Sequence, residues 1–212
     1  MDLLRVIIHE AGQIFLIPCI IILLLFILIA LSQVGSLLIE YFMERRHLKA
    51  NVPQLIHNMH GKSAGGLHGV IVAGGLLPRQ KKALFTLLDS KLPETEQTAL
   101  ARSLLSIEEK HYEKATLITD LIAKLGPMIG LLGTLIPLGP GIMALGEGDT
   151  AILSQSLSIA FDTTIAGLLA AAVCYTISRI RSRWYDTYLQ MTETLMECLL
   201  EEMKTPGGRS GA

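Results

Sequence analysis

One carboxylate and three threonines lie inside apolar stretches that are long enough to cross a membrane. Asp162, Thr163 and Thr164 are in one such stretch and Thr134 is in another. An ionisable side chain inside a membrane span is costly and marks a functional site, commonly an ion or proton pathway. A dry site favours the uncharged form of a carboxyl group, so Asp162 could carry a proton there. Asp162 is therefore a candidate ion-pathway residue, with structural pairing or an interfacial position as the alternative.

The threonine hydroxyls have two possible roles. Each can donate to a main-chain carbonyl of its own helix, which is common for threonines in membrane helices. Each could equally bind water or a carboxylate of a partner. We group Thr134, Thr163, Thr164 and Asp162 as candidate pore-lining residues.

Small residues repeat on one face of both stretches. In the first stretch they are Gly126, Gly130, Gly133, Pro137 and Gly141, and in the second Ser156, Ala160, Thr164, Gly167, Ala171, Cys174 and Ser178. Steps of three and four keep each set on one side of a helix, where small side chains let two backbones approach closely. We expect Gly126, Gly130, Gly133, Ala160 and Gly167 to mediate helix packing. Packing within one three-helix monomer is one explanation, and a pore or an oligomer axis is the favoured one.

Other chemistries lack the residues they need. Gly61-Lys62-Ser63 resembles the end of a P-loop, but Ile56 stands where that motif requires its first glycine. His57, His60, His68 and His111 are interpreted as solvated or core-edge side chains. Cys19, Cys174 and Cys198 form no CxxC pair and are interpreted as reduced thiols. We therefore expect no catalytic residue, metal or cofactor, and a protein that is not an enzyme.

The composition places these residues in a membrane protein. Half of the 212 residues are hydrophobic and 17% are charged, the mean hydropathy is +0.48, and soluble domains carry about 25% charged residues. The formal net charge of −1 argues against a nucleic-acid binder. Spanning a bilayer takes about 20 apolar residues, and we predict transmembrane helices at 14–39, 125–145 and 151–177. The first is interpreted as a retained helix and not as a cleaved signal peptide.

Lysine and arginine predict the orientation. Residues 40–124 contain twelve of them, the segment before the first span contains only Arg5, and 146–150 contains none. The positive-inside rule therefore places the N-terminus outside and the C-terminus in the cytoplasm of an inner (cytoplasmic) membrane. The remaining segments are then a short external N-terminus (1–13), a cytoplasmic helical domain (40–124), an external loop (146–150), a cytoplasmic C-terminal helix (178–204) and a disordered tail (205–212).

Apolar periodicity extends the spans into this cytoplasmic part. A helical stripe runs from Leu104 to Leu125 and predicts a helix that enters the second span without a break. Residues 40–49 are predicted to prolong the first span. Six glycines between Gly61 and Pro78 predict turns between short helices.

The two glycine-rich spans resemble the MotA/TolQ/ExbB proton channel family, most closely its three-span ExbB/TolQ branch. The matching motifs are Gly126-Pro127-x-x-Gly130-Leu131-Leu132-Gly133-Thr134 and Ala160-Phe161-Asp162-Thr163-Thr164-Ile165-Ala166-Gly167-Leu168. The resemblance implies an all-α membrane protein with three transmembrane helices and long cytoplasmic helical extensions.

The resemblance also implies a function and partners. It implies the pore-forming subunit of a membrane motor or stator driven by an ion-motive force, with a proton as the expected ion. It implies a homopentamer in the lipid bilayer around two copies of an ExbD/TolR/MotB-like single-span subunit with an intramembrane Asp. Thr134 and Thr164 would face that Asp as pore-lining groups. A non-motor channel or transporter subunit, or a membrane scaffold, is the alternative.

Two positions depart from the family pattern. Ile159 stands where ExbB and TolQ often have a Glu, and we hypothesise that Asp162 replaces that Glu as the channel's own carboxylate. Pro137 stands where the family usually has Gly, and Pro140 is additional. The two prolines predict a kink or a break in the outer half of the second span.

Overall fold

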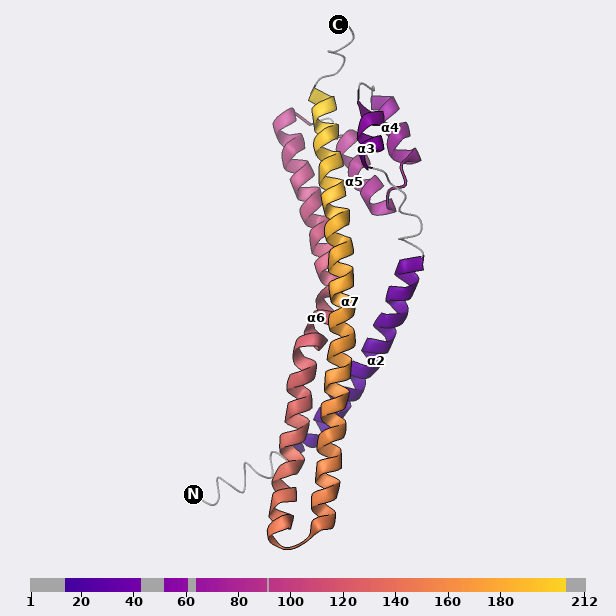
Figure 1. The fold of residues 1–212 in the computed structure, drawn as a ribbon. Coiled ribbons are helices and arrows are strands. Elements are labelled where there is room, and N and C mark those ends of the chain that lie inside the picture. Colours follow the sequence, from indigo (N-terminus) through magenta and orange to yellow (C-terminus); the bar gives the residue numbers. More distant parts are fainter. Residues whose placement is uncertain (1–13, 43–51, 61–63, 91, 205–212) are drawn as a thin grey trace, which may run out of the picture. The chain divides into compact units, whose positions relative to one another are not determined.

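The computed structural model describes residues 14–42, 52–60, 64–90 and 92–204 (Figure 1). Within them the chain forms six helices and no strand. The helices are α2 (Leu16–Glu40), α3 (Val52–Met59), α4 (Ala64–Ala73), α5 (Pro78–Leu88), α6 (Glu94–Gly146) and α7 (Thr150–Lys204). Three of them, α2, α6 and α7, are long and apolar enough to cross a membrane. The predicted all-α membrane fold is therefore confirmed.

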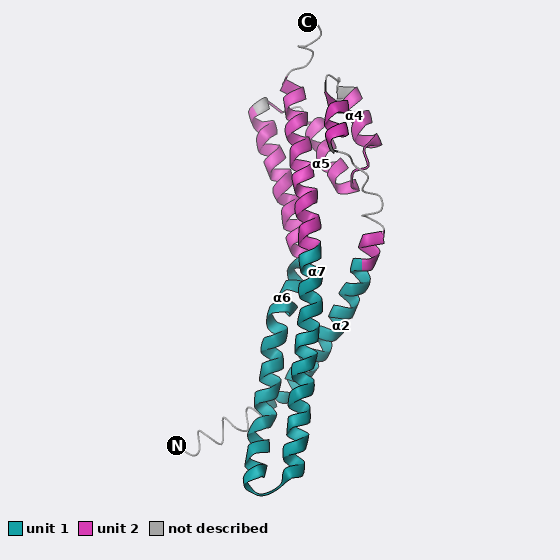
Figure 2. Ribbon diagram, in the orientation of Figure 1, with its two compact units in different colours: residues 1–37, 116–180 teal, residues 38–115, 181–212 magenta. Residues whose placement is uncertain are grey.

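The chain divides into two compact units (Figure 2). Unit 1 comprises residues 1–37 and 116–180, and unit 2 comprises residues 38–115 and 181–212. Helices α6 and α7 each contribute residues to both units. The predicted N-terminal segment 1–13, the continuation of the first span over 43–49 and the disordered tail 205–212 lie outside the described residues.

Apolar side chains and a hydrogen bond hold α2, α6 and α7 together in unit 1. Its buried cluster consists of Phe26, Ala30, Ile122, Ala170 and Cys174. The Cys19 thiol of α2 also donates to the carbonyl oxygen of Ile129 in α6, at 3.3 Å. Large apolar side chains point outward along all three helices, for example Leu28, Leu131 and Leu168. Such a surface is suited to lipid or to other membrane helices, because water would not solvate it.

A tight turn makes α6 and α7 antiparallel neighbours. Gly148 has a φ of 84°, a left-handed conformation that glycine adopts without a steric penalty. The Asp149 N–H donates to the Ala144 carbonyl oxygen at 2.9 Å and so satisfies the end of α6. The Asp149 carboxylate accepts from the N–H groups of Ala151 and Ile152, at 3.0 and 3.2 Å. Asp149 is thus the N-cap of α7.

Helix α6 contains three prolines and does not break. Pro127, Pro137 and Pro140 all lie inside it, and the helix continues to Gly146. The break that Pro137 and Pro140 suggested in the sequence is therefore absent. The helix that the apolar stripe predicted to enter the second span without a break is confirmed by α6.

Unit 2 packs the three short helices onto segments of α6 and α7. Its core contains Met59 of α3, Ile71 of α4, Leu84 of α5 and Leu195 of α7, each 1% exposed or less. Gln80 is 2% exposed and joins two elements. Its carbonyl oxygen accepts from the Leu77 N–H at the start of α5, and its amide nitrogen donates to the Tyr188 carbonyl oxygen in α7.

Part of the glycine-rich region forms helix α4 where turns were predicted, whereas Gly74 and Gly75 lie in the predicted turn between α4 and α5. Gly65, Gly66 and Gly69 lie inside α4, so that part of the prediction is wrong. Glycine costs about 1 kcal/mol per helical position relative to alanine. Burial of Leu67 and Ile71, which are 2% and 1% exposed on one face of α4, offsets that cost.

Candidate functional site

Helices α6 and α7 meet through backbone contact at three glycines in unit 1. A Cβ atom added to Gly167 would lie 2.5 Å from the Gly126 carbonyl oxygen and 3.0 Å from the Gly130 Cα atom. A Cβ atom added to Gly126 would lie 2.8 Å from the Gly167 carbonyl oxygen. Real Cβ atoms do not approach backbone atoms this closely, so larger residues would force the helices apart. Ala160, which is 3% exposed, lies farther along α7.

Thr163 belongs to this contact. A Cβ atom on Gly133 would lie 2.7 Å from the Thr163 Cβ atom, and Thr163 is 6% exposed. Its hydroxyl donates to the carbonyl oxygens of Ile159 and Ala160, both at 3.0 Å. Within the chain, Thr163 therefore lies in the contact between α6 and α7.

Thr134 and Thr164 lie at the rim of the same contact, and both are half-buried. Each directly follows a residue of the Gly133–Thr163 pair. Each step of one residue rotates the side chain by about 100° around the helix axis. Because α6 and α7 run in opposite directions, the two rotations bring the side chains of Thr134 and Thr164 to the same side of the pair. The Thr134 hydroxyl donates to the Leu131 carbonyl oxygen at 2.6 Å and the Thr164 hydroxyl to the Ala160 carbonyl oxygen at 3.1 Å. Both hydroxyl oxygens keep acceptor capacity.

Asp162 is exposed and separated from the two threonines. It precedes Thr163 by one residue, so the same rotation places it on the opposite side of the α6–α7 pair from Thr134 and Thr164. Its neighbours Phe161 and Ile165 are 63% and 56% exposed. The structure thus places Thr134 and Thr164 on one side of the α6–α7 pair and Asp162 on the other.

A second polar pair joins α6 and α7, and no sequence motif predicted it. The Ser178 hydroxyl donates to the Asp120 carboxylate. Ser178 is 4% exposed, and Thr119 beside Asp120 is fully buried. Ser178 was identified only as a small residue, and Asp120 carried no motif. The signal that could have found them is their spacing, because each lies fourteen residues from a candidate threonine, Thr134 or Thr164.

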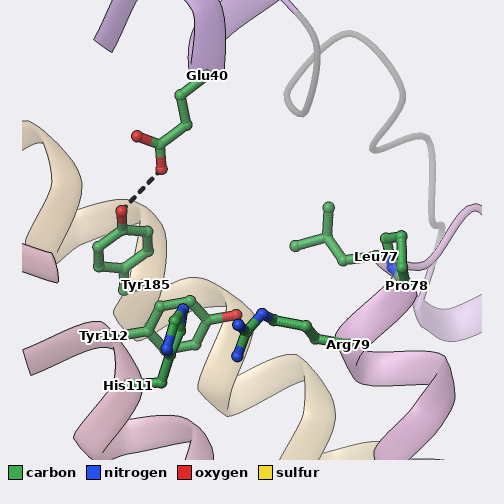
Figure 3. Close-up of a pocket in the computed structure, with 7 residues that line it drawn as sticks. All are labelled: Glu40, Leu77, Pro78, Arg79, His111, Tyr112 and Tyr185. Carbon is green, nitrogen blue, oxygen red and sulfur yellow. Dashed lines mark hydrogen bonds between the residues drawn. The ribbon is translucent and has the colours of Figure 1, made fainter. Parts of the chain in front are cut away.

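Unit 2 contains a pocket of about 240 Å³ near the end of α2 (Figure 3). The Glu40 carboxylate lies at its edge, accepting from Arg181 Nε at 2.9 Å and from the Tyr185 hydroxyl at 2.8 Å. The Tyr185 ring stacks on the Tyr112 ring with centroids 4.4 Å apart. Because Glu40 already has two donors, we interpret this cluster as structural.

Metal ligation finds no support among the residues that the structure describes. Across those residues, no group of three or more His, Cys, Asp or Glu side chains could hold a metal ion. The described ion pair of His60 with Glu202, at 2.7 Å, involves a histidine that is 70% exposed. Among the described residues, Cys19 and Cys174 are buried and Cys198 is half-buried, all as free thiols.

Known proteins similar to this chain include a family that covers this helix pair. The model of the MotA/TolQ/ExbB proton channel family matches residues 75–194, which is more than half of the chain. The chain is also similar to motility protein A of Borreliella burgdorferi, with 29% identity over 120 residues. That alignment covers 56% of this chain and 45% of the relative, so the chain spans less than half of the relative's length. The family match includes the three-glycine contact, both threonine hydroxyls and the Asp120–Ser178 pair.

Proposed function

Because the chain belongs to the MotA/TolQ/ExbB proton channel family, we propose that it is the pore-forming subunit of an ion-driven membrane complex. The complex converts ion flow into mechanical work through a partner subunit, and the expected ion is the proton. The observation that carries the proposal is the pair of half-buried threonines, Thr134 and Thr164, on one side of the glycine contact.

Those threonines supply polar groups on an otherwise apolar surface. Their neighbours Leu131, Leu135 and Leu168 are 51–60% exposed and require lipid or protein around them. A hydroxyl that already donates to its own helix carbonyl can still accept a hydrogen bond or coordinate a cation. Two such groups on one side could accept a hydrogen bond from a protonated carboxyl group of another chain. Once that carboxyl group is ionised, the hydroxyl hydrogens can rotate to donate to it.

The partner is proposed from the family. Two copies of an ExbD/TolR/MotB-like single-span subunit would lie inside a pentamer of this chain, each with an intramembrane Asp that carries the ion. The ion would bind this Asp on one side of the membrane and leave on the other, while the pentamer rotates or rearranges around the partner helices. One elementary charge that crosses 100 mV releases about 2.3 kcal/mol, so several charges could drive such a rearrangement.

Asp162 is proposed as a carboxylate of the channel itself. It lies on the opposite side of the α6–α7 pair from the threonines, so in a ring of subunits it would face a neighbouring copy instead of the partner Asp. If Asp162→Asn left ion flux unchanged, this role would be wrong.

The proposed membrane arrangement follows the charge distribution. The complex would lie in the inner (cytoplasmic) membrane, with α2, α6 and α7 crossing it. The N-terminus would be outside, and unit 2 and the C-terminus would lie in the cytoplasm.

Ion flux through the reconstituted complex tests the proposal. The full chain and its single-span partner would be inserted into proteoliposomes, and proton uptake would be followed with an internal pH dye under an imposed potential. Thr164→Val removes the rim hydroxyl and is expected to reduce uptake at least tenfold.

The adjacent threonine supplies the matched control. Thr163→Val makes the same chemical change at a buried side chain that bonds only within its own helix in the described contacts. We expect uptake within threefold of the unchanged complex. Equal uptake in both variants would contradict a pore-lining role for Thr164, and a wild-type complex that moves neither H⁺ nor Na⁺ would contradict the proposed function.

A further inference from the structure

The strongest feature outside the threonine site is the hydrogen bond between Asp120 of α6 and Ser178 of α7. The two residues are 58 positions apart in the sequence and belong to the same compact unit. Ser178 is 4% exposed, whereas Asp120 is half-buried. The carboxylate is therefore held from one side by a buried hydroxyl and remains accessible from another.

The helix register relates this pair to the threonine pair. Asp120 precedes Thr134 by fourteen residues and Ser178 follows Thr164 by fourteen residues. Fourteen residues are close to four helical turns, so each member lies on the same face as its threonine at an axial distance of about 21 Å. The α6–α7 pair thus carries two polar layers on one side.

Lys124 of α6 is the one charged residue of this helix pair between the two layers. Residues 125–133 of α6 and 165–177 of α7 contain no Asp, Glu, Lys, Arg or His. The lysine and arginine distribution assigns one end of the helix pair to the cytoplasm. From the threonine pair toward that end, Asp120 is therefore the first carboxylate on this side. Its charged neighbours are Lys124, one turn along α6, and Arg179, which follows Ser178 and interacts electrostatically with Asp120.

We propose that Asp120 is the cytoplasmic acceptor of the transported cation and that Ser178 positions its carboxylate. This inference rests on the proposed function and adds a second ion-handling layer to it. A cation released near Thr134 and Thr164 would enter the inner part of the pathway and bind the Asp120 carboxylate. For a proton, the carboxylate becomes a carboxylic acid and then returns the proton to a cytoplasmic water molecule, which regenerates the carboxylate.

A purely structural role predicts something different. A hydrogen bond that only joins α6 to α7 would affect assembly and stability. It would change ion flux only as a consequence of altered assembly or stability. Asp120→Asn keeps the size of the side chain and its ability to accept from Ser178, but it cannot bind a proton or carry a negative charge. The variant therefore separates the charge of Asp120 from its role in helix contact.

The test uses the full chain in complex with its single-span partner in proteoliposomes, with H⁺ uptake and Na⁺ uptake measured separately. We expect Asp120→Asn to lower uptake of the transported cation at least tenfold. Ser178→Ala should lower it about threefold, and Ser178→Thr, which keeps the hydroxyl, should restore at least half. Asp186→Asn on the exposed surface of α7 is the matched control and should leave uptake unchanged. Size-exclusion chromatography would verify that each variant assembles.

The possible outcomes separate the two proposals. An intact Asp120→Asn complex that conducts within twofold of the wild type overturns the ion-handling role and leaves the proposed function standing. If Asp120→Asn does not assemble, Ser178→Ala decides, and uptake within 20% of the wild type in that variant overturns the role. A wild-type complex that moves neither cation overturns both the proposed function and this inference.

Discussion

At the scale of single residues, Gly167 sets how closely α6 and α7 approach. A Cβ atom there would meet backbone atoms of both Gly126 and Gly130, which cannot rotate away as a side chain can. We expect Gly167→Ala to lower the free energy of unfolding by about 1–3 kcal/mol, the usual cost of overpacking a tight contact. The midpoint of thermal unfolding in mild detergent measures the change.

Gly35 provides the matched control for this prediction. It lies in α2, and no atom lies within 4 Å of the position where its Cβ atom would be. Gly35→Ala should leave the unfolding midpoint unchanged or raise it, because alanine is favoured over glycine in a helix by about 1 kcal/mol. A Gly167→Ala protein as stable as Gly35→Ala would show that the helix contact tolerates a methyl group.

The sequence predicted the family of this chain better than the geometry of its helix contact. Glycine spacing and the threonine motifs identified the family, which the family match confirms. Periodicity could not tell which neighbouring threonine faces the partner helix, since Thr163 and Thr164 differ by only 100° of helix rotation. The Asp120–Ser178 bond joins residues 58 positions apart, and no local pattern encodes such a pairing.

At the scale of elements, a buried ion pair fixes the end of α2 against α7 within unit 2. The side chains of Arg181 and Glu40 are 6% and 14% exposed, and their closest N–O distance is 2.9 Å. Removing one member of a buried pair leaves the other charge poorly solvated, at a cost of about 3–5 kcal/mol. We therefore expect Arg181→Met to lower the thermal unfolding midpoint of the purified protein markedly.

An arginine on the same helix supplies the comparison. Arg183 is exposed, and Arg183→Met should change the free energy of unfolding by about 0.5 kcal/mol or less. The double variant Glu40→Gln/Arg181→Met should lose less stability than the two single variants together, because neither charge is then left alone. Equal midpoints for Arg181→Met and Arg183→Met would show that the ion pair contributes little.

Element prediction succeeded where one apolar face dominates and failed where tertiary burial compensates a poor local sequence. The stripe from Leu104 to Leu125 has no breaker and became part of α6. The glycines of α4 have a low helix propensity, but Leu67 and Ile71 dock into the core of unit 2. Likewise, Pro137 and Pro140 each lack a backbone N–H donor, and α6 nevertheless continues to Gly146.

At the scale of the whole molecule, a single chain leaves polar side chains accessible on both sides of the α6–α7 pair. Thr134 and Thr164 stand among exposed leucines on one side of the helix pair, and Asp162 stands exposed on the other. An exposed carboxylate inside a membrane span requires water or a protein partner. We therefore expect the side that carries Asp162 to contact water or another chain, and not lipid alone.

The proposed assembly has a stoichiometry that can be measured. Native mass spectrometry of this chain co-expressed with a candidate single-span partner, in mild detergent, should give five copies of the chain with two of the partner. Because Thr134 and Thr164 face one side, replacing both with leucine should weaken partner retention at least tenfold and leave the pentamer intact. Asp162→Leu, on the opposite side, should instead affect the pentamer. A monomer or dimer that retains no such partner would contradict the motor assembly and favour a transporter or scaffold role.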